Sequence, residues 1–407
     1  MSKLGRNVLG LGAVSFFTDV STEMIYPLLP VFLAGVLGTS STFIGAIEGA
    51  AETTASLLKL VSGWWSDRMK TRKPFVVIGY LIASIARPFT AAARSATQVL
   101  AIRVTDRIGK GLRTSPRDAL LADSAPPEAR GLAYGFHAAA DNAGAVLGPL
   151  LAFFILKLHH VRILDTSKHL SAHDEIAIRN VFWLSAIPAG IAILVLLFVV
   201  RDVPKHDDQH GASGASLDTE RLSGKFWAYL TVVLLFTLGN STDAFLLLRA
   251  SQLGVPVALA PVLWAVLNFV KSATGTYGGQ LSDRIGRKPL IVGGWLLYAA
   301  VYFAFAWAGA PWEAWALFAV YGIFYGMTEG TEKALVADIV PRTRRGAAFG
   351  WYNLAIGLGA LPASLIFGWI WDNHGAPAAF VFGASLALFA AVLMAIVAPS
   401  HRTAAAN

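Results

Sequence analysis

Acidic residues interrupt an apolar run near the start of the sequence. Asp19, Glu23, Tyr26, Pro27 and Pro30 follow one another at spacings of four, three, one and three residues, which places them on one stripe of a helix. A carboxylate in a low-dielectric wall can take up and release a proton near neutral pH. We therefore expect this stripe to face a cavity and to serve proton movement.

A second acid repeats this pattern later in the chain. The segment 240–243, Asn-Ser-Thr-Asp, echoes Ser-Thr-Glu at 21–23, which makes Asp243 the counterpart of Glu23. Intramembrane acids of this kind mark proton and substrate pathways. The alternative is that these acids pair structurally with a base in another apolar run: Arg87, Lys271 or Arg249.

The apolar run at 96–115 is unusually polar, because it contains Arg103, Asp106, Arg107, Lys110 and Arg113. A charge at the centre of an inserted helix costs roughly 2.5–3.5 kcal/mol, so these side chains should face partners or water. Asp106 and Lys110 are four residues apart and can pair within the helix. That pairing would describe a salt-bridged helix end, whereas a functional role is favoured for Arg103 and Arg107.

Acids and bases occur in similar numbers within these runs, so the charge of a bound solute stays open. A basic path would suit an organic anion, and the acids would suit a cation or a proton. We select as candidate pathway residues Asp19, Glu23, Tyr26, Glu48, Glu52, Arg87, Arg103, Arg107, Asp141, Asp243 and Lys271.

The amino-acid composition indicates which class of protein contains these residues. Of 407 residues, 55% are hydrophobic and only 14% are charged, and the mean hydropathy is +0.57, which leaves too little polar surface for a soluble globule. The net charge of +8 resides in short loops instead of one basic patch, so nucleic acid is not an expected partner. The absence of cysteine excludes disulfides and thiolate metal sites.

Apolar runs of about 20 residues or more predict an all-α polytopic membrane protein with twelve transmembrane helices. The basic N-terminus leads into the first of them with no short apolar region that ends in a cleavage site, so we expect a first transmembrane helix there and not a signal peptide. The basic loops alternate, and the positive-inside rule then places both termini in the cytoplasm. The spans lie near 8–37, 42–65, 74–93, 96–115, 131–156, 180–200, 226–248, 255–281, 289–309, 312–335, 344–371 and 376–398.

The chain divides into two related halves. A polar, small-residue stretch within 201–225 is typical of a flexible cytoplasmic linker, and it separates a six-helix bundle at 1–200 from another at 226–407. The alignment of the halves that places Gly111 on Gly326 also brings Asp123 onto Asp338 and Gly144 onto Gly359, with no gap between them. In parallel repeats of this kind the substrate binds between the halves near the membrane midplane.

Nearly the same charged phrase follows the second and the eighth apolar run. Residues 63–68 lead to Arg-Lys-Pro at 72–74, and residues 279–284 lead to Arg-Lys-Pro at 287–289. Both resemble motif A of the major facilitator superfamily, although the first copy has one extra residue. The resemblance covers nearly the whole chain and implies two pseudo-symmetric six-helix bundles, alternating access, and a gating latch formed by Gly63, Asp67, Arg68, Arg72, Gly279, Asp283, Arg284 and Arg287.

The segment 135–149 is similar to motif C, the antiporter signature of that superfamily. Gly135, Gly144, Gly148 and Pro149 match it, whereas Ala-Phe at 152–153 replaces its trailing glycine pair. Small residues allow close helix packing and a proline removes a backbone hydrogen bond, so a hinge is implied. The alternative is a packing face with no meaning for transport direction.

The fourth run also resembles a family motif. Arg107, followed by Gly111, is similar to motif B, in which the resemblance implies an arginine that serves proton transfer. Arg103 is a competing match.

No nucleotide-binding loop or nucleophile–base arrangement is evident, so we expect an ion gradient to supply the energy, and no enzymatic activity, cofactor or metal. The histidines at 159, 160, 169 and 173 are assigned to a solvated extracytoplasmic loop. We predict a monomeric transporter of the bacterial drug/metabolite type in the inner membrane, exporting a small organic solute by proton antiport. The alternatives are a proton symporter that imports a small, for example anionic, metabolite, and a receptor that kept the fold but lost transport.

Overall fold

The computed structural model describes residues 5–68, 71–125, 130–161, 170–202, 222–340 and 345–397, and every regular element within these ranges is a helix. The predicted all-α class is therefore confirmed. The helices are α1 Arg6–Ile25, α2 Leu29–Gly35, α3 Ser41–Arg68, α4 Lys73–Ala86, η1 Arg87–Ala92, α5 Ala96–Asp123, α6 Arg130–Leu158, α7 Ala172–Leu184, α8 Ala186–Phe198, α9 Gly224–Gly239, α10 Ala244–Gln252, η4 Val257–Leu259, α11 Ala260–Ile285, α12 Arg287–Trp307, α13 Pro311–Ile339 and α14 Arg345–Val397.

Prolines and one glycine set the breaks within the long apolar runs. Pro27 lies in the turn between α1 and α2, and Pro88 is the second residue of η1, because a proline has no N–H to continue the helical ladder. Gly375 breaks α14 with a φ of 84°, a conformation that glycine adopts without a steric penalty. These breaks leave Tyr26 at the end of α1 and Arg87 at the start of η1.

One predicted loop is wrong. The stretch before residue 180 is assigned to a loop by its polarity, but α7 already begins at Ala172. Ser171 and Asp174 form a reciprocal capping box at its start, which supplies partners for the first amides of the helix. His173 therefore lies in a helix and contacts His159 O at 2.6 Å, whereas His169 lies outside the described residues.

Eight segments are long and apolar enough to cross a membrane, judged over the described residues. One of them, Ala348–Val397, includes the break at Gly375. Helices α3, α5 and α13 are 28, 28 and 29 residues long and lie where spans are predicted, but they are not among these eight. The number of twelve crossings stays a prediction.

The chain forms two compact units. Unit 1 consists of Met1–Thr39, Ala50–Gly214 and Pro256–Ala265, and unit 2 consists of Ser40–Gly49, Ala215–Val255 and Val266–Asn407. Helices α3 and α11 thus each contribute residues to both units.

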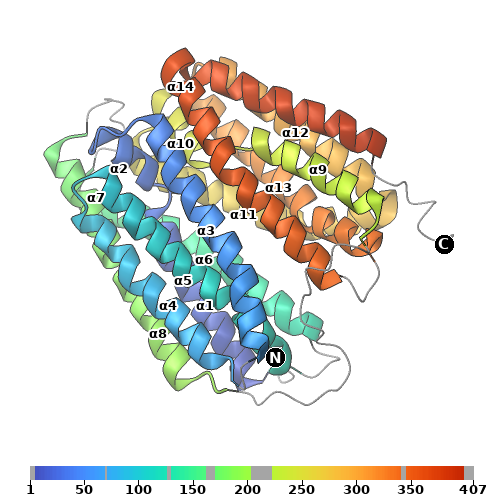
Figure 1. Cartoon of the computed structure of the whole chain (residues 1–407). Coiled ribbons are helices and arrows are strands. Elements are labelled where there is room, and N and C mark those ends of the chain that lie inside the picture. The colour runs from blue at the N-terminus through green and yellow to red at the C-terminus, as the bar shows by residue number, and fades with distance from the viewer. Residues whose placement is uncertain are drawn as a thin grey trace. The chain divides into compact units, whose positions relative to one another are not determined.

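Within unit 1, α1 packs against α6 and α8, and α4 packs against α5 (Figure 1). Val14, Tyr80, Leu120 and Leu196 from four of these helices meet in one fully buried cluster. Within unit 2, α14 packs against α9 and α12, and α12 also packs against α13. The core of unit 2 is aromatic, with Phe236 stacked on Trp295 at 4.2 Å between ring centres.

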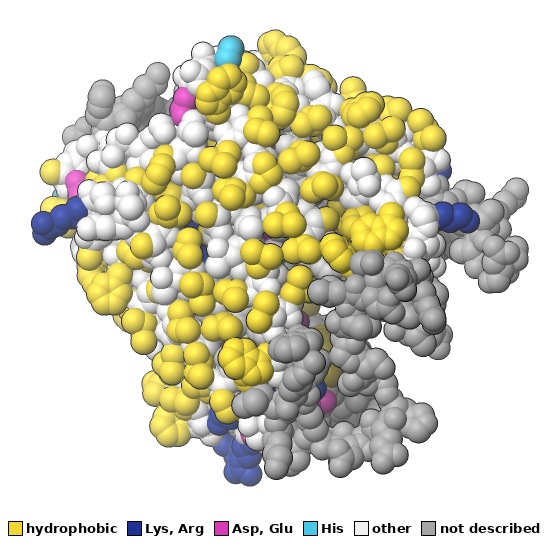
Figure 2. All heavy atoms as spheres, viewed as in Figure 1, with side chains coloured by type: hydrophobic (Ala, Val, Ile, Leu, Met, Phe, Trp, Pro, Cys, Tyr) yellow, Lys and Arg dark blue, Asp and Glu magenta, His cyan; other side chains and the backbone are white. Residues whose placement is uncertain are grey.

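Large hydrophobic side chains remain exposed on many helices. Phe198 and Ile396 are each 73% exposed, and Trp307 is 72% exposed. Hydrophobic side chains cover much of the face drawn in Figure 2. Such extensive apolar exposure is unfavourable in water and suits a lipid environment.

Candidate functional site

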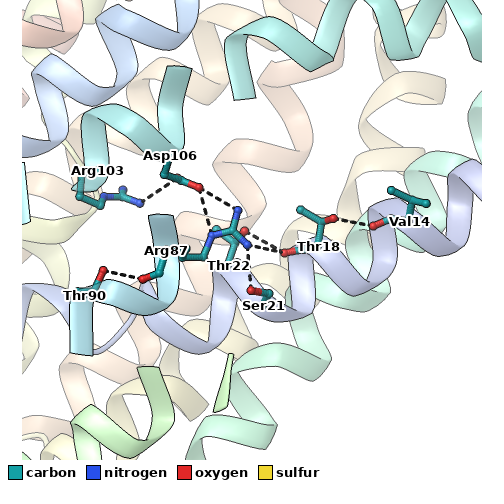
Figure 3. A network of polar contacts seen from close by, with 8 residues as sticks. All are labelled: Val14, Thr18, Ser21, Thr22, Arg87, Thr90, Arg103 and Asp106. Atoms are coloured by element: carbon teal, nitrogen blue, oxygen red, sulfur yellow. Dashed lines mark hydrogen bonds and ion pairs between the residues drawn. The ribbon is translucent and has the colours of Figure 1, made fainter. Parts of the chain in front are cut away.

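A buried arginine–aspartate pair joins three elements of unit 1 (Figure 3). Arg87 Nη2 is 2.9 Å and Nε is 3.2 Å from Asp106 Oδ1. Arg87 Nη1 donates to Ser21 Oγ at 3.0 Å and to Thr18 O at 3.3 Å. Because both charged side chains are at most 5% exposed, each depends on the other for the solvation that water would otherwise provide.

Arg103 adds a third charge to this group. Its Nη1 lies 3.7 Å from Asp106 Oδ2, and its guanidinium lies 5.8 Å from the centre of the Tyr26 ring. The ion pairs of Asp106 are thus with arginines of η1 and of its own helix, whereas the spacing also allowed a pair with Lys110. Lys110 instead interacts electrostatically with Glu52 and Asp19.

The bases proposed as structural partners of the pathway acids have other partners. Arg87 binds Asp106, and Arg249 donates to the carbonyls of Phe305 and Ala308 at 3.1 and 2.9 Å. Lys271 Nζ lies 3.0 Å from Glu329 Oε2. Within the described part of the chain these three bases thus have close partners other than the pathway acids, although Lys271 still acts electrostatically on Asp243.

The acids of α1 lie where α6 approaches most closely. A Cβ atom on Gly144 would be 2.5 Å from Phe16 O and 3.0 Å from Asp19 Cβ, and one on Gly148 would be 2.6 Å from Val20 O. These two glycines of the motif C segment therefore allow α1 and α6 to touch through their backbones. Gly135 has no neighbour within 4 Å of such a Cβ, and Pro149 lies inside α6.

Asp19 and Glu23 have different surroundings on α1. Glu23 Oε2 accepts a hydrogen bond from Trp264 Nε1 at 2.6 Å, and the Trp264 and Tyr26 rings lie 4.9 Å apart. Asp19 experiences the negative charges of Glu23 and Asp141, as well as positive charges from α5. Three acidic side chains, Asp19, Glu23 and Asp141, thus act on one another electrostatically.

The two predicted acids of α3, Glu48 and Glu52, also interact with other charged side chains. Glu52 interacts electrostatically with Lys110, Arg107 and Lys59. Glu48 is 7% exposed, and its charge acts on Asp243. Arg107 is 8% exposed, whereas Glu52 itself is half-buried.

Asp243 of unit 2 is held by tyrosines. Its two carboxylate oxygens accept hydrogen bonds from Tyr321 at 2.8 Å and Tyr325 at 3.1 Å. Lys271 Nζ lies 4.6 Å from the centre of the Tyr325 ring, a cation–π contact. Asp243 thus meets neutral donors directly, while the nearby lysine binds Glu329.

A second half-buried carboxylate of unit 2, Glu332, is absent from the predicted site. Its Oε1 accepts from Trp295 Nε1 at 2.8 Å and its Oε2 accepts from Tyr352 OH at 2.7 Å. The internal repeat aligns Glu332 with Arg117 of unit 1. His137, which lies 3.6 Å from Asp141, was also missed.

The structure describes only part of the two motif A segments. The side chains of Asp67, Arg68 and Asp283 are not among the parts that it describes. Arg72 forms an ion pair with Asp123, and Arg287 Nε lies 3.3 Å from Asp338 Oδ2. The internal repeat aligns the two residues of one pair with those of the other, so the duplication extends to the contact itself.

The glycines of motif A differ in their surroundings. A Cβ on Gly63 would lie 3.3 Å from Ser115 Cβ, whereas Gly279 has no neighbour within 4 Å of such an atom. Arg284 is exposed. Only the first copy therefore brings its glycine into a tight helix contact.

Comparisons with known proteins give a consistent result. The sequence profile of the Major Facilitator Superfamily matches residues 11–331 and 250–407. The "Uncharacterized MFS-type transporter MJ1317" of Methanocaldococcus jannaschii is 30% identical over 402 residues, which make up 97% of this chain and 96% of that protein. Multidrug resistance protein MdtH of Edwardsiella ictaluri is 29% identical over 153 residues, 37% of each chain.

The fold is also found among solved structures. A crystal structure of a mutant of the nucleoside transporter NupG matches with a TM-score of 0.77 at 12% identity, covering 96% of this chain and 99% of that one. At this identity the similarity establishes the fold.

Proposed function

Because this chain belongs to the Major Facilitator Superfamily, we propose that it is a proton-coupled exporter that exchanges a small organic solute for protons by alternating access. Membership of this family makes it a multi-pass membrane transporter and not an enzyme. The direction and the coupling ion are the parts proposed.

The contact between α1 and α6 carries this proposal. Gly144 and Gly148 lie against the turns of α1 that bear Asp19 and Glu23. A bend of α6 near Pro149 would change the packing around both carboxylates, and with it the cost of keeping them charged. The same contact thereby couples a conformational change to the gain or loss of a proton.

Two further observations agree with export. The segment with these glycines resembles the antiporter signature, and a partial relative is named a multidrug resistance protein. In this scheme the motif A ion pairs, Arg72–Asp123 and Arg287–Asp338, stabilise the cytoplasmic ends of their helices as part of the gate.

We extend the proposal to the organisation of the chain. Two six-helix halves, 1–200 and 226–407, are joined by a cytoplasmic linker at 201–225. Both termini lie in the cytoplasm, and a monomer in the inner membrane performs transport, because each chain contains both halves of the pathway.

The alternative is import by proton symport. It is favoured by the buried arginines of unit 1, since Arg87, Arg103 and Arg107 are 4%, 5% and 8% exposed and would attract an anionic solute if one of them were released from its partner.

Reconstituted vesicles distinguish the two directions. A thermal-shift screen of organic cations and anions, ethidium and fluorescein among them, first selects a ligand, since a bound ligand stabilises the folded state. Antiport predicts that vesicles with an acidic interior accumulate this ligand, whereas symport predicts accumulation with an acidic exterior. Export by antiport is contradicted if an acidic exterior drives uptake, or if neither gradient moves ligand and added ligand moves no protons.

A third alternative, a receptor without transport, predicts that Glu23→Gln and Asp243→Asn leave the function of the protein intact. The exporter predicts that each abolishes gradient-driven accumulation.

A further inference from the structure

Glu332 lies on α13 with both oxygens occupied by neutral donors. Trp295 of α12 donates to Oε1 at 2.8 Å, and Tyr352 of α14 donates to Oε2 at 2.7 Å. Tyr229 of α9 contacts the backbone oxygen of the same residue at 3.3 Å. One acidic side chain and its peptide group thus connect α13 with three neighbouring helices.

The charged neighbours of Glu332 belong to its own helix. Glu329 and Lys333 act on it electrostatically, but Lys333 Nζ lies 3.3 Å from Glu329 Oε1, and Lys271 Nζ lies 3.0 Å from Glu329 Oε2. The facing helices supply Trp295, Tyr352 and Tyr229, none of which carries a positive charge. Among the described residues, no Lys, Arg or His forms an ion pair with Glu332.

This environment accepts both protonation states of the carboxyl group. The ionised form receives two hydrogen bonds, yet a half-buried charge without an ion-pair partner is still less well solvated than in water. In the protonated form Oε1 still accepts from the Trp295 N–H, which can only donate. The new proton resides on Oε2 and is donated to the Tyr352 oxygen, because a phenol can accept as well as donate.

The equivalent position of unit 1 shows that the fold does not require an acid here. The internal repeat aligns Glu332 with Arg117, Trp295 with Tyr80 and Tyr352 with His137. Arg117 Nη2 lies 2.8 Å from Asp118 Oδ1, and a guanidinium does not lose its proton in proteins. The position holds a permanent charge in one half and a titratable group in the other.

We propose that Glu332 is a proton-binding site of unit 2, which is occupied in one conformation of the transport cycle and empty in another. This inference rests on the proposed proton coupling and names a carboxylate that carries it. Movement of α12 or α14 against α13 would remove one of the two donors, and the carboxyl group would then bind its proton more tightly.

Infrared difference spectroscopy tests proton binding without any solute. The C=O stretch of a protonated carboxyl group is followed in the purified protein as the pH is raised. We expect a band that titrates in the wild type and in Glu329→Gln, the matched control one turn away, and that is lost in Glu332→Gln. Tyr352→Phe should shift the band, because it removes the partner of Oε2. An unchanged band in Glu332→Gln and in Tyr352→Phe would overturn the proposal.

Transport in vesicles tests the role in coupling, using the ligand that the wild type accumulates. Glu332→Gln should reduce gradient-driven accumulation by roughly tenfold or more, within the 5–150-fold range typical of coupled sites. Exchange of labelled for unlabelled ligand, which needs no net proton movement, should stay within about twofold of wild type. Normal gradient-driven accumulation, or equal loss of both activities in a folded variant, would overturn the role in coupling. If the wild type itself moves no ligand, the exporter proposal fails while the infrared result still decides proton binding at Glu332.

Discussion

The two halves of this transporter use equivalent positions for opposite chemistry. The internal repeat aligns Arg87 with Tyr302 and Asp106 with Tyr321. In unit 1, Arg87 binds Asp106 and also Ser21 Oγ at 3.0 Å. In unit 2, Tyr302 OH lies 3.4 Å from Ser241 Oγ, and Ser241 is the counterpart of Ser21 in the Ser-Thr-acid repeat.

The contact with a serine is thus present in both units, but only unit 1 makes it with a charged side chain. In a buried arginine–aspartate pair, neutralising either side chain would leave the other as an unpaired buried charge. We therefore expect neither group to change its protonation state during transport. Tyrosine hydroxyls can donate or accept, so they tolerate a neighbouring carboxylate in either protonation state. At these equivalent positions unit 1 therefore has an ionic core, Arg87 with Asp106, and unit 2 has a polar core of tyrosine hydroxyls beside Asp243.

The largest expected effect comes from breaking the ionic core. Asp106→Asn leaves Arg87 charged, buried and without a counter-ion, so the free energy of unfolding should fall by roughly 3–5 kcal/mol. Denaturation of the purified protein in mixed micelles measures this. The double variant Arg87→Met/Asp106→Leu is the control and should recover most of the loss, because no charge is then stranded. A loss below about 1 kcal/mol for Asp106→Asn would show that the core of unit 1 is not ionic in this sense.

The equivalent change in unit 2 should cost less. Tyr321→Phe removes one hydrogen bond to the Asp243 carboxylate, at 2.8 Å, and such bonds contribute about 1.5–3 kcal/mol. The control Tyr302→Phe removes the 3.4 Å contact with Ser241 and the hydroxyl contacts with Tyr298 and Tyr321. None of these partners is a carboxylate, so this variant should cost less still in the same denaturation assay. If Tyr321→Phe destabilised the protein as much as Asp106→Asn, the contrast between the two cores would be refuted.

Glycines at equivalent positions provide a third comparison. A Cβ on Gly144 would meet the Phe16 carbonyl at 2.5 Å, whereas one on Gly359 would meet the Thr237 side chain at 2.9 Å. Backbone cannot move aside locally, so Gly144→Ala should cost about 1–3 kcal/mol and impair transport. Gly359→Ala should cost under about 1 kcal/mol, because a side chain can shift.

Gly135→Ala serves as the control, since its Cβ would meet no atom within 4 Å. Thermal unfolding and vesicle transport measured on all three variants test this order. Equal stability and activity of Gly144→Ala and Gly359→Ala would argue against the close contact of α1 with α6.

The smallest effects on stability are expected at the ion pair that both halves contain, Arg72–Asp123 in one and Arg287–Asp338 in the other. Arg72→Ala and Arg287→Ala each break a partly exposed ion pair, which contributes about 0–1 kcal/mol. Arg72 should matter more, because its side chain is 12% exposed and that of Arg287 is 22% exposed. The exposed Arg284 is the control. Thermal unfolding in low and high salt measures the difference, and a larger loss for Arg287→Ala would reverse the order.

Much of the fold was predictable because its signals are local. Apolar runs, the prolines at their breaks and the repeated Gly-x-x-x-Asp-Arg phrase can each be recognised within a few residues. The start of α7 was missed although Ser171 and Asp174 have capping-box spacing, because the polarity of the stretch favoured a loop. A helix start in a polar segment depends on its cap more than on its hydropathy.

The site was predictable only in part. Asp19, Glu23 and Asp243 are acids in apolar runs, and that alone selected them. Glu332 was overlooked because its hydrogen-bond donors, Trp295 and Tyr352, lie 37 and 20 residues away in the chain. Nothing near it in sequence distinguishes it from Glu329, which is paired with lysines.

The sequence by itself determined a duplicated membrane protein of this superfamily, because hydropathy and motif spacing are properties of the chain. Only the tertiary structure decided which charges neutralise one another. In sequence Asp106 has a basic neighbour four residues away, yet it binds an arginine 19 residues away. The physical reason is that the energy of a buried charge depends on distances across helices in a low-dielectric interior, and those distances exist only after the helices have packed.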